Sequence, residues 1–386
     1  MNLSARCLRS FVLNSARAIY RARISERSFS VSALSPREAV LPYFEESSSS
    51  ELNGLLSRVR SKVLIPRHLN AEQERLVYKQ ANASRLETDP VIITIGDEDV
   101  RLEHINRLRD IPSYKKSLKE ALDLCSTPQD WENVIELIKG YKKARIKLGP
   151  DMVERIVRKF NVAGMQHLML QLFKQVAKTG FSLQHLNVSQ LALQGCRYKA
   201  QDSDWNIEKT AKALDYAEEI IELLEHPLHG GGTPVLSKDD SRAQPVTIGA
   251  VLEIASLKAD RTLNGKDTDG KVKMYTERLV QSIRHHALPD FADLDTKPGQ
   301  ARSPGFHNMQ ILSHWICVWH GLKLARKVLG PDMPGNTAEV TQYVDDLKVR
   351  IDKGVKSLQR HSKKGEDTWL SRRWNTALSD IDASES

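Results

Sequence analysis

The residues most suggestive of catalysis lie in the sequence HPLHGGGTP, residues 226–234. A histidine followed by three glycines can present backbone N–H groups to an oxyanion, as the HGGG loop of some hydrolases does. That chemistry also needs a serine nucleophile on a G-x-S-x-G turn between a strand and a helix, and this chain has no such sequence. We therefore interpret residues 228–246 as a linker loop and predict no catalytic residue.

Histidine and cysteine residues are not spaced for a metal site. His285 and His286 are adjacent, so on a helix their side chains diverge by about 100°. His314 and His320 lie six positions apart without a supporting carboxylate, and the cysteines at positions 7, 125, 196 and 317 form no C-x-x-C pair. The sequence also has no P-loop and no dinucleotide-binding fingerprint. We therefore predict a non-catalytic protein without metal or cofactor.

Basic residues gather in two stretches that have the composition of an RNA-binding surface. One runs over residues 142–159, and the other runs from Lys348 to Arg373 with nine basic residues against three acids. Lysine and arginine neutralise backbone phosphates, and tryptophan offers a ring on which a base can stack. A solvated helix face is the alternative. The predicted RNA-binding residues are Lys142, Lys143, Arg145, Lys147, Arg155, Arg158, Lys159, Trp369, Arg372, Arg373 and Trp374.

Helices must position these side chains, because apolar residues recur with helical periodicity almost throughout the chain after Ser113. Thr127 and Pro128 suit the cap and first turn of one of these helices. Glycines at positions 149, 164, 180 and 330 stand where helices should end. The predicted helices cover residues 113–125, 127–148, 150–163, 165–179, 184–199, 207–226, 247–260, 270–286, 306–329 and 337–360.

Two segments before Ser113 differ from this pattern. β-Branched residues alternate in VIITIGDEDVRLEHI, residues 91–105, around Gly96 and Asp97, which predicts a small β-hairpin. The sequence EESSSS, residues 45–50, is predicted to be a polar linker. Helices are predicted over residues 51–62 and 68–86.

The sequence LMLQLFKQVAKTGFSL, residues 168–183, predicts one amphipathic helix that Gly180 ends. Its apolar stripe includes Leu172 and Phe173, and Gln171 lies on the opposite face. A short helix cannot bury such a stripe alone, and an antiparallel partner covers only part of it. Stacking helix pairs buries a continuous core, which is how helical-repeat proteins are built.

The longer sequence MVERIVRKFNVAGMQHLMLQLFKQVAKTGFSL, residues 152–183, resembles a pentatricopeptide repeat. It has an aliphatic first helix, a glycine turn and a second helix of the pattern L-x-L-F-x-x-V-x-x-x-G. The preceding KARIKLGPD resembles the closing G-x-x-P-D of the family, although Gly149 here directly precedes Pro150. The likeness covers residues 113–183 and, more weakly, extends to 227. It implies the architecture and no nucleotide code, and a tetratricopeptide-like or unrelated helical bundle is the alternative.

The N-terminal segment, residues 1–29, has the composition of a mitochondrial transit peptide. It is rich in serine, can form an amphipathic helix and contains six arginines against one acid, Glu26. These residues account for five of the eight net positive charges, so the chain without them is only mildly basic. We predict cleavage near Phe29. The chain lacks a run of about 18 apolar residues, so no membrane span is predicted.

The predicted fold class is therefore all-α, a helical-hairpin repeat or α-solenoid of the pentatricopeptide or tetratricopeptide type, with a small β-hairpin before the repeats. The predicted organisation is a transit peptide (1–29), a polar linker with N-terminal helices (30–88), the hairpin with the repeats (89–227), the linker loop (228–246) and a C-terminal helical region with a basic tail (247–386).

The resemblance to pentatricopeptide-like proteins of mitochondrial translation implies a role in gene expression in the mitochondrial matrix. The poorly formed repeats, the hairpin and the basic tail favour a structural protein of the mitochondrial ribosome, in its small subunit, that contacts rRNA and neighbouring ribosomal proteins. Two alternatives stay open. One is a factor of the same fold that processes other mitochondrial RNA or activates its translation. The other is a respiratory-complex assembly factor that binds assembly intermediates.

Overall fold

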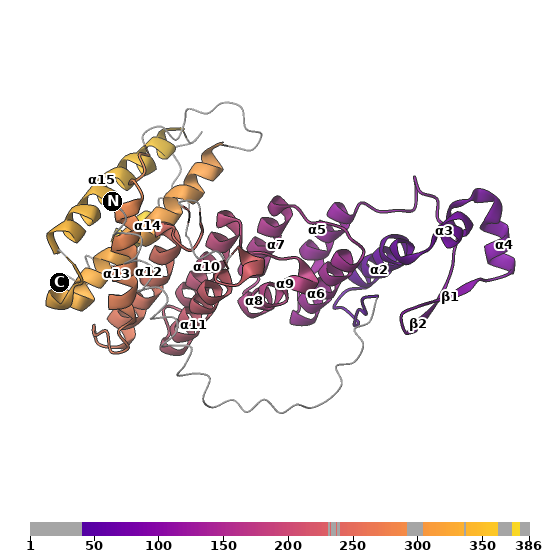
Figure 1. The fold of residues 1–386 in the computed structure, drawn as a ribbon, viewed down its shortest axis with the longest axis horizontal. Helices are drawn as coiled ribbons and strands as arrows, with labels where there is room; N and C mark the ends of the chain where they lie inside the picture. The colour runs from indigo at the N-terminus through magenta and orange to yellow at the C-terminus, as the bar shows by residue number, and fades with distance from the viewer. Residues whose placement is uncertain are drawn as a thin grey trace. The chain divides into compact units, whose positions relative to one another are not determined.

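The computed structural model describes residues 41–230, 232, 237, 240–291, 304–335, 337–361 and 373–378. Most of these residues are helical, and the β structure among them is one two-stranded sheet (Figure 1). They belong to one compact unit, Val40–Ser386. None of the described helices is both long and apolar enough to cross a membrane. The predicted transit peptide lies outside the described residues.

Short elements precede residue 113. In chain order they are α2 (Ser50–Val59), a π-helical turn (Arg60–Leu64), a 3-10 turn (Ile65–His68), α3 (Ala71–Tyr78), a 3-10 turn (Gln80–Asn82), α4 (Ala83–Thr88), β1 (Ile92–Ile95) and β2 (Glu98–Arg101). The strands pair antiparallel, with Ile95 opposite Glu98. Gly96 lies in the turn between them with a positive φ of 64°, which glycine adopts without strain. The predicted hairpin is confirmed.

The serine-rich segment 45–50 is docked on the helices and is not a free linker. The backbone N–H of Ser48 donates to Asp130 Oδ1 (2.9 Å), and its hydroxyl donates to Asp130 Oδ2 (2.7 Å). Ser49 caps α2 through its side chain. The serine groups of this polar segment thus satisfy a helix end and a buried carboxylate, as serine can do in place of binding water.

Longer helices form the rest of the described chain. They are α5 (Tyr114–Leu124), α6 (Pro128–Lys143), α7 (Pro150–Val162), α8 (Gln166–Lys174), α9 (Val176–Thr179), α10 (Leu186–Gln201), α11 (Ile207–Leu224), α12 (Pro245–Thr262), α13 (Lys271–His285), α14 (Pro304–Leu329) and α15 (Thr337–His361). A further helical turn covers residues 373–378. α6 begins as predicted, because Thr127 and Asp130 form a reciprocal capping box around its first turn.

The helix predicted over 165–179 is divided into α8 and α9. Gln175 separates them with φ −97° and ψ 33°, outside the helical region. The Thr179 hydroxyl donates to the carbonyl of Leu172 (2.8 Å). A side chain thus takes the place of the backbone N–H that would bond to this carbonyl in an unbroken helix. Gly180 then ends α9 with a φ of 73°, as predicted.

Helices adjacent in sequence pack together, and helices further apart join them (Figure 1). α7 packs on α8 and α10, α10 packs on α11 and α12, and α12 packs on α13 and α14. Most of the described buried apolar side chains between Leu52 and Ala377 form one core cluster, and smaller clusters are separate from it. In α8, Leu172 and Phe173 are buried and Gln171 is exposed, so the predicted faces of this helix are confirmed.

The backbones of α12 and α14 approach closely at two glycines. A Cβ atom on Gly249 would lie 2.6 Å from Val318 Cγ2, and one on Gly321 would lie 2.9 Å from the backbone nitrogen of Glu253. Such distances exclude a larger side chain unless the helices move apart. This close contact brings Glu253 on α12 beside His320 on α14.

Candidate nucleic-acid interface

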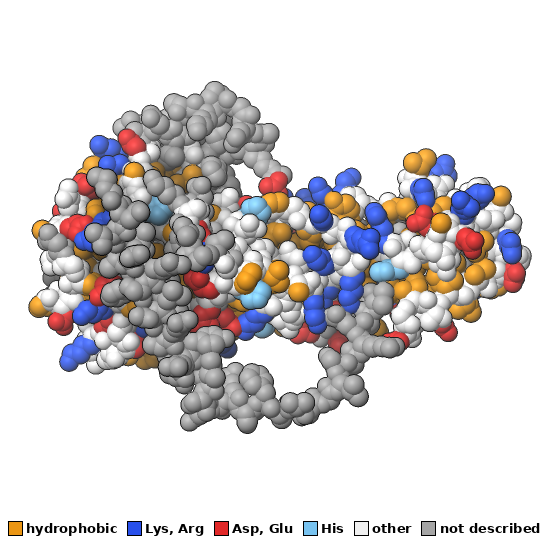
Figure 2. Space-filling model, viewed as in Figure 1, with side chains coloured by type: hydrophobic (Ala, Val, Ile, Leu, Met, Phe, Trp, Pro, Cys, Tyr) orange, Lys and Arg blue, Asp and Glu red, His pale blue; other side chains and the backbone are white. Residues whose placement is uncertain are grey.

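The first predicted basic stretch lies at the end of α6, in the following turn and along α7. Lys142, Arg145 and Lys147 are exposed, and within the described ranges none of their side chains has an ion-pair partner. Lys143 is half-buried. Burial and, second to it, the charge of Lys143 lower the pKa of His68. Figure 2 shows basic side chains gathered over the part of the molecule that carries α5 and α6.

The turn after α6 fixes the position of Arg145. Its N–H donates to the Lys142 carbonyl (3.1 Å), and the Ile146 N–H donates to the Tyr141 carbonyl (2.8 Å), the two bonds of a Schellman motif. Arg145 consequently has a positive φ of 57°, a conformation that favours glycine. Gly149, which was expected to end this helix, instead precedes α7 as its N-cap. The expectation failed because α6 already ends at Lys143 and the chain turns at Arg145, four residues before Gly149.

The basic side chains of α7 are partly neutralised. Arg158 pairs with Glu154 one turn earlier (2.7 Å), and Lys159 Nζ pairs with Asp123 Oδ1 (2.6 Å). The hydrogen bond from Lys159 lowers the pKa of the Asp123 carboxyl, and the charge of nearby Arg155 acts in the same direction. Arg155 itself is exposed. The turn after α6 therefore presents more uncompensated charge than α7 does.

The second predicted basic stretch is only partly exposed where the structure describes it, because Lys348, Lys353 and Lys356 of α15 are exposed whereas Arg373 at its end is buried. Trp369 and Arg372 lie outside the described residues. Arg373 and Trp374 are only 8% and 3% exposed. Trp374 packs edge-on against Trp319, with ring centroids 4.5 Å apart. We therefore withdraw Arg373 and Trp374 from the predicted RNA contacts, because neither side chain is accessible to a phosphate or a base.

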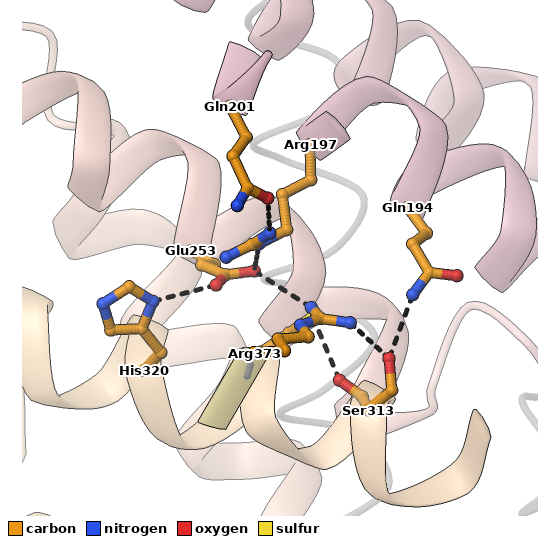
Figure 3. Close-up of polar contacts among 8 residues, drawn as sticks. Gln194, Arg197, Gln201, Glu253, Ser313, His320 and Arg373 are labelled. Carbon is orange, nitrogen blue, oxygen red and sulfur yellow. Dashed lines mark hydrogen bonds and ion pairs between the residues drawn. The ribbon is translucent and has the colours of Figure 1, made fainter. Parts of the chain in front are cut away.

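Arg373 instead belongs to a buried polar cluster around Glu253 (Figure 3). Arg197 Nε lies 2.9 Å from Glu253 Oε2, and His320 Nδ1 lies 2.9 Å from Oε1. Arg373 Nη2 lies 3.9 Å from Oε2, and Arg373 also donates to the Ser313 hydroxyl. Burial raises the pKa of Glu253, but the charge of Arg197, the hydrogen bond from His320 and the charge of Arg373 together hold it well below its usual range.

This cluster joins α10, α12, α14 and the last helical turn, so its arrangement is that of a structural ion-pair network. Glu253 was missed by sequence reasoning. The only signal is a single carboxylate in the apolar sequence VTIGAVLEIASLKA, since a charge buried there needs a partner. The partners themselves come from other helices. Across the described residues, no three His, Cys, Asp or Glu side chains are grouped so that they could hold a metal ion.

The histidine of the HGGG sequence has a packing role. His229 is buried in the 3-10 turn Pro227–His229 after α11. Its Nδ1 accepts from the Leu183 N–H (3.1 Å), so Nε2 must carry the proton that it donates to the Phe173 carbonyl (3.1 Å). Burial lowers its pKa. The hydrogen bond from neutral His229 to Phe173 therefore holds the start of the linker loop against α8.

Sequence similarity to known proteins identifies the family of this chain. Residues 27–376 match the family described as "Mrp13: Mitochondrial ribosomal protein mS27". The chain belongs to this family. A Neurospora crassa protein named small ribosomal subunit protein mS27 is 31% identical over an alignment of 280 residues, and the match covers 67% of this chain and 69% of that relative.

Membership of the mS27 family confirms the predicted function, a structural component of the small subunit of the mitochondrial ribosome. It also confirms the mitochondrion as the location. The ribosomal prediction is thereby favoured over a free RNA-processing factor and over a respiratory-complex assembly factor. Association with other ribosomal components follows from the same membership.

Proposed function

We propose that this mS27-family chain binds rRNA of the mitochondrial small subunit through the basic turn after α6. The observation that carries the proposal is the exposure of Lys142, Arg145 and Lys147 without any acid partner in the described ranges. Lysine and arginine that lack acid partners can neutralise RNA phosphates and release their counterions. Lys143 and Arg155 flank the turn and extend the proposed contact.

The geometry of the turn supports this proposal. The Schellman hydrogen bonds hold Arg145 at the end of α6, so its charge is presented from an ordered turn that is already formed before binding. Pre-formed contacts cost less conformational entropy on binding than contacts made by a free chain. Arg158 and Lys159 would first have to leave Glu154 and Asp123, so their contribution is smaller. Trp369 and Arg372 remain proposed contacts of the C-terminal tail.

We further propose that the helices form a pentatricopeptide-like scaffold for these contacts. Successive helices pack on one another, and their apolar stripes merge into one core. This packing is what a stack of helix pairs requires. Matrix location is part of the same proposal. It is supported by the arginine-rich residues 1–29 and by a family match that begins at residue 27.

The test combines Lys142→Ser, Arg145→Gly and Lys147→Ser in the mature protein. Glycine is chosen at position 145 because it adopts the positive φ without strain. Each lost contact to single-stranded RNA reduces the slope of log binding constant against log salt concentration by about 0.7. Loss of three contacts should therefore reduce this slope by about 2 and the affinity at 100 mM salt by about 100-fold. Fluorescence anisotropy with a labelled fragment of small-subunit rRNA measures both quantities.

The matched control is Lys79→Ser, Lys266→Ser and Lys273→Ser, which removes the same charge. These three lysines are exposed and have no ion pair with another described residue. Circular dichroism should show unchanged helix content in both triple variants. Equal affinity losses in the two variants would mean that the turn has no special role. Binding of the first variant at wild-type strength would contradict the proposal outright.

A further inference from the structure

A separate group of cations lies on α10 and α11, outside both predicted basic stretches. Lys199 Nζ is 5.7 Å and Lys212 Nζ is 5.9 Å from the centroid of the Tyr216 ring. Lys199 and Tyr216 are half-buried, and Lys212 is exposed. Two ammonium groups from different helices thus lie beside one aromatic ring.

This group carries positive charge that its surroundings do not neutralise. Burial lowers the pKa of Lys199, and the charges of Lys212 and Lys209 lower it further. Burial and the charges of Lys199 and Lys212 also lower the pKa of His167, against which Glu132 acts only weakly. Within the described part of the chain, neither Lys199 nor Lys212 forms an ion pair with an acid.

One acid near the group already has a cation of its own. Glu219, one turn beyond Tyr216 on α11, pairs with Lys174 of α8. Crowded like charges disfavour their own charged forms, and an added anion relieves that repulsion. Such a group is therefore better suited to binding an anion than to stabilising the free protein.

We propose that Lys199, Lys212 and Tyr216 form a second RNA-binding site, which takes backbone phosphates of rRNA. Each ammonium group has three donors for phosphate oxygens, and the phenol hydroxyl of Tyr216 adds a further donor. RNA is favoured over an acidic peptide because the aromatic ring beside the two cations also suits a nucleotide, which presents a base together with its phosphates. This inference rests on the proposed role of the chain as an rRNA-binding protein of the ribosome.

Binding of the purified mature protein to a labelled single-stranded 20-nucleotide RNA provides the first test. Lys199→Ser with Lys212→Ser should weaken binding by about 25-fold at 100 mM salt and reduce the log–log slope by about 1.4. Lys266→Ser with Lys273→Ser removes equal charge and should change affinity much less. Lys199→Arg with Lys212→Arg should retain binding. The thermal midpoint of the serine pair should not fall, because two repelling charges are removed.

Lysine acylation followed by mass spectrometry provides the second test, on intact mitochondrial small subunits. Lys199 and Lys212 should react at least about fivefold more slowly in the subunit than in free protein, and ribonuclease digestion should abolish that protection. Protection that survives digestion would identify a protein partner and overturn the proposal. Equal reactivity in both states would overturn it as well.

The two sites can fail independently. In one outcome, the variant with Lys199→Ser and Lys212→Ser binds RNA as strongly as the Lys266→Ser and Lys273→Ser control, while the triple variant of the α6 turn loses affinity. In that case the second site is wrong and the first is supported. If the α6-turn variant binds normally while the serine pair loses affinity, the reverse holds. If wild-type protein does not bind either RNA, the proposed function fails in solution, and the acylation result alone decides the second site.

Discussion

Glu253 keeps its charge in the interior because two arginines and a hydrogen-bonding histidine from other helices surround it. Arg197 approaches from α10, His320 from α14 and Arg373 from the last helical turn. Taking a carboxylate out of water costs several kcal/mol, and its partners recover this only when they are all in place. Replacing one member therefore leaves the other charges buried without compensation.

The first prediction concerns this cluster. Glu253→Gln should lower the free energy of unfolding by about 3–5 kcal/mol, because Arg197 and Arg373 lose their carboxylate partner. Urea denaturation followed by circular dichroism measures the change. Glu219→Gln is the control, since its ion pair with Lys174 is partly exposed and should contribute less than about 1 kcal/mol. Similar losses in the two variants would show that the buried cluster is not specially stabilising.

The same variant should alter the dependence of stability on pH. The folded pKa of Glu253 lies below its ordinary value of 4.5, so its contribution is fully present above about pH 4.5. It is lost progressively as pH falls toward the folded pKa. The stability difference between wild type and Glu253→Gln should therefore shrink on acidification from about pH 5 to about pH 3. A difference that grows over this range would contradict the assigned direction.

At the scale of elements, α8 shows how one helix is held by a single face. Leu172 and Phe173 are fully buried in the main core, whereas Gln171 beside them faces solvent. The Phe173 ring also lies near Phe181, with centroids 6.3 Å apart. The packing of α8 therefore depends on which residue occupies each helical position.

The second prediction follows from this packing. Leu172→Asp or Phe173→Asp should destabilise the protein by about 3 kcal/mol or more, because each buries a charge without a partner. Gln171→Asp makes the same charge change on the exposed face and should cost about 0.5 kcal/mol or less. Thermal unfolding of the three variants compares them directly. Matching midpoints for all three would mean that the two faces are energetically equivalent.

At the scale of the whole molecule, we predict that residues 1–29 direct import into mitochondria before the chain joins the ribosome. The third prediction is that changing Arg6, Arg9 and Arg17 to Glu abolishes uptake by isolated mitochondria, because a positive amphipathic segment is attracted by the negative matrix side. The control replaces the same residues by Lys, which keeps the charge, and should be imported. N-terminal sequencing of the matrix form should begin near Phe29. Undiminished uptake of the Glu variant, or a mature protein that still begins at Met1, would contradict a cleaved transit peptide.

The amino-acid pattern alone determined most of the secondary structure and the side each helix buries. The apolar spacing that includes Leu172 and Phe173, the Thr127 cap and the Gly96 turn act within a few residues, so they can be recognised without a fold. The break at Gln175 and the left-handed conformation of Arg145 were not predicted. Each depends on hydrogen bonds that the residue types alone do not indicate.

Only the tertiary structure decided which charges face water. Arg373 and Trp374 belong to a basic, aromatic sequence, yet both are buried, whereas Lys142 and Arg145 are exposed. Lys199 and Lys212 become neighbours only when α10 packs on α11. The physical reason is the distance along the sequence over which each interaction acts. Helix periodicity arises from hydrogen bonds four residues apart, while the burial and pairing of a charge depend on segments that are distant in sequence and meet only in the folded chain.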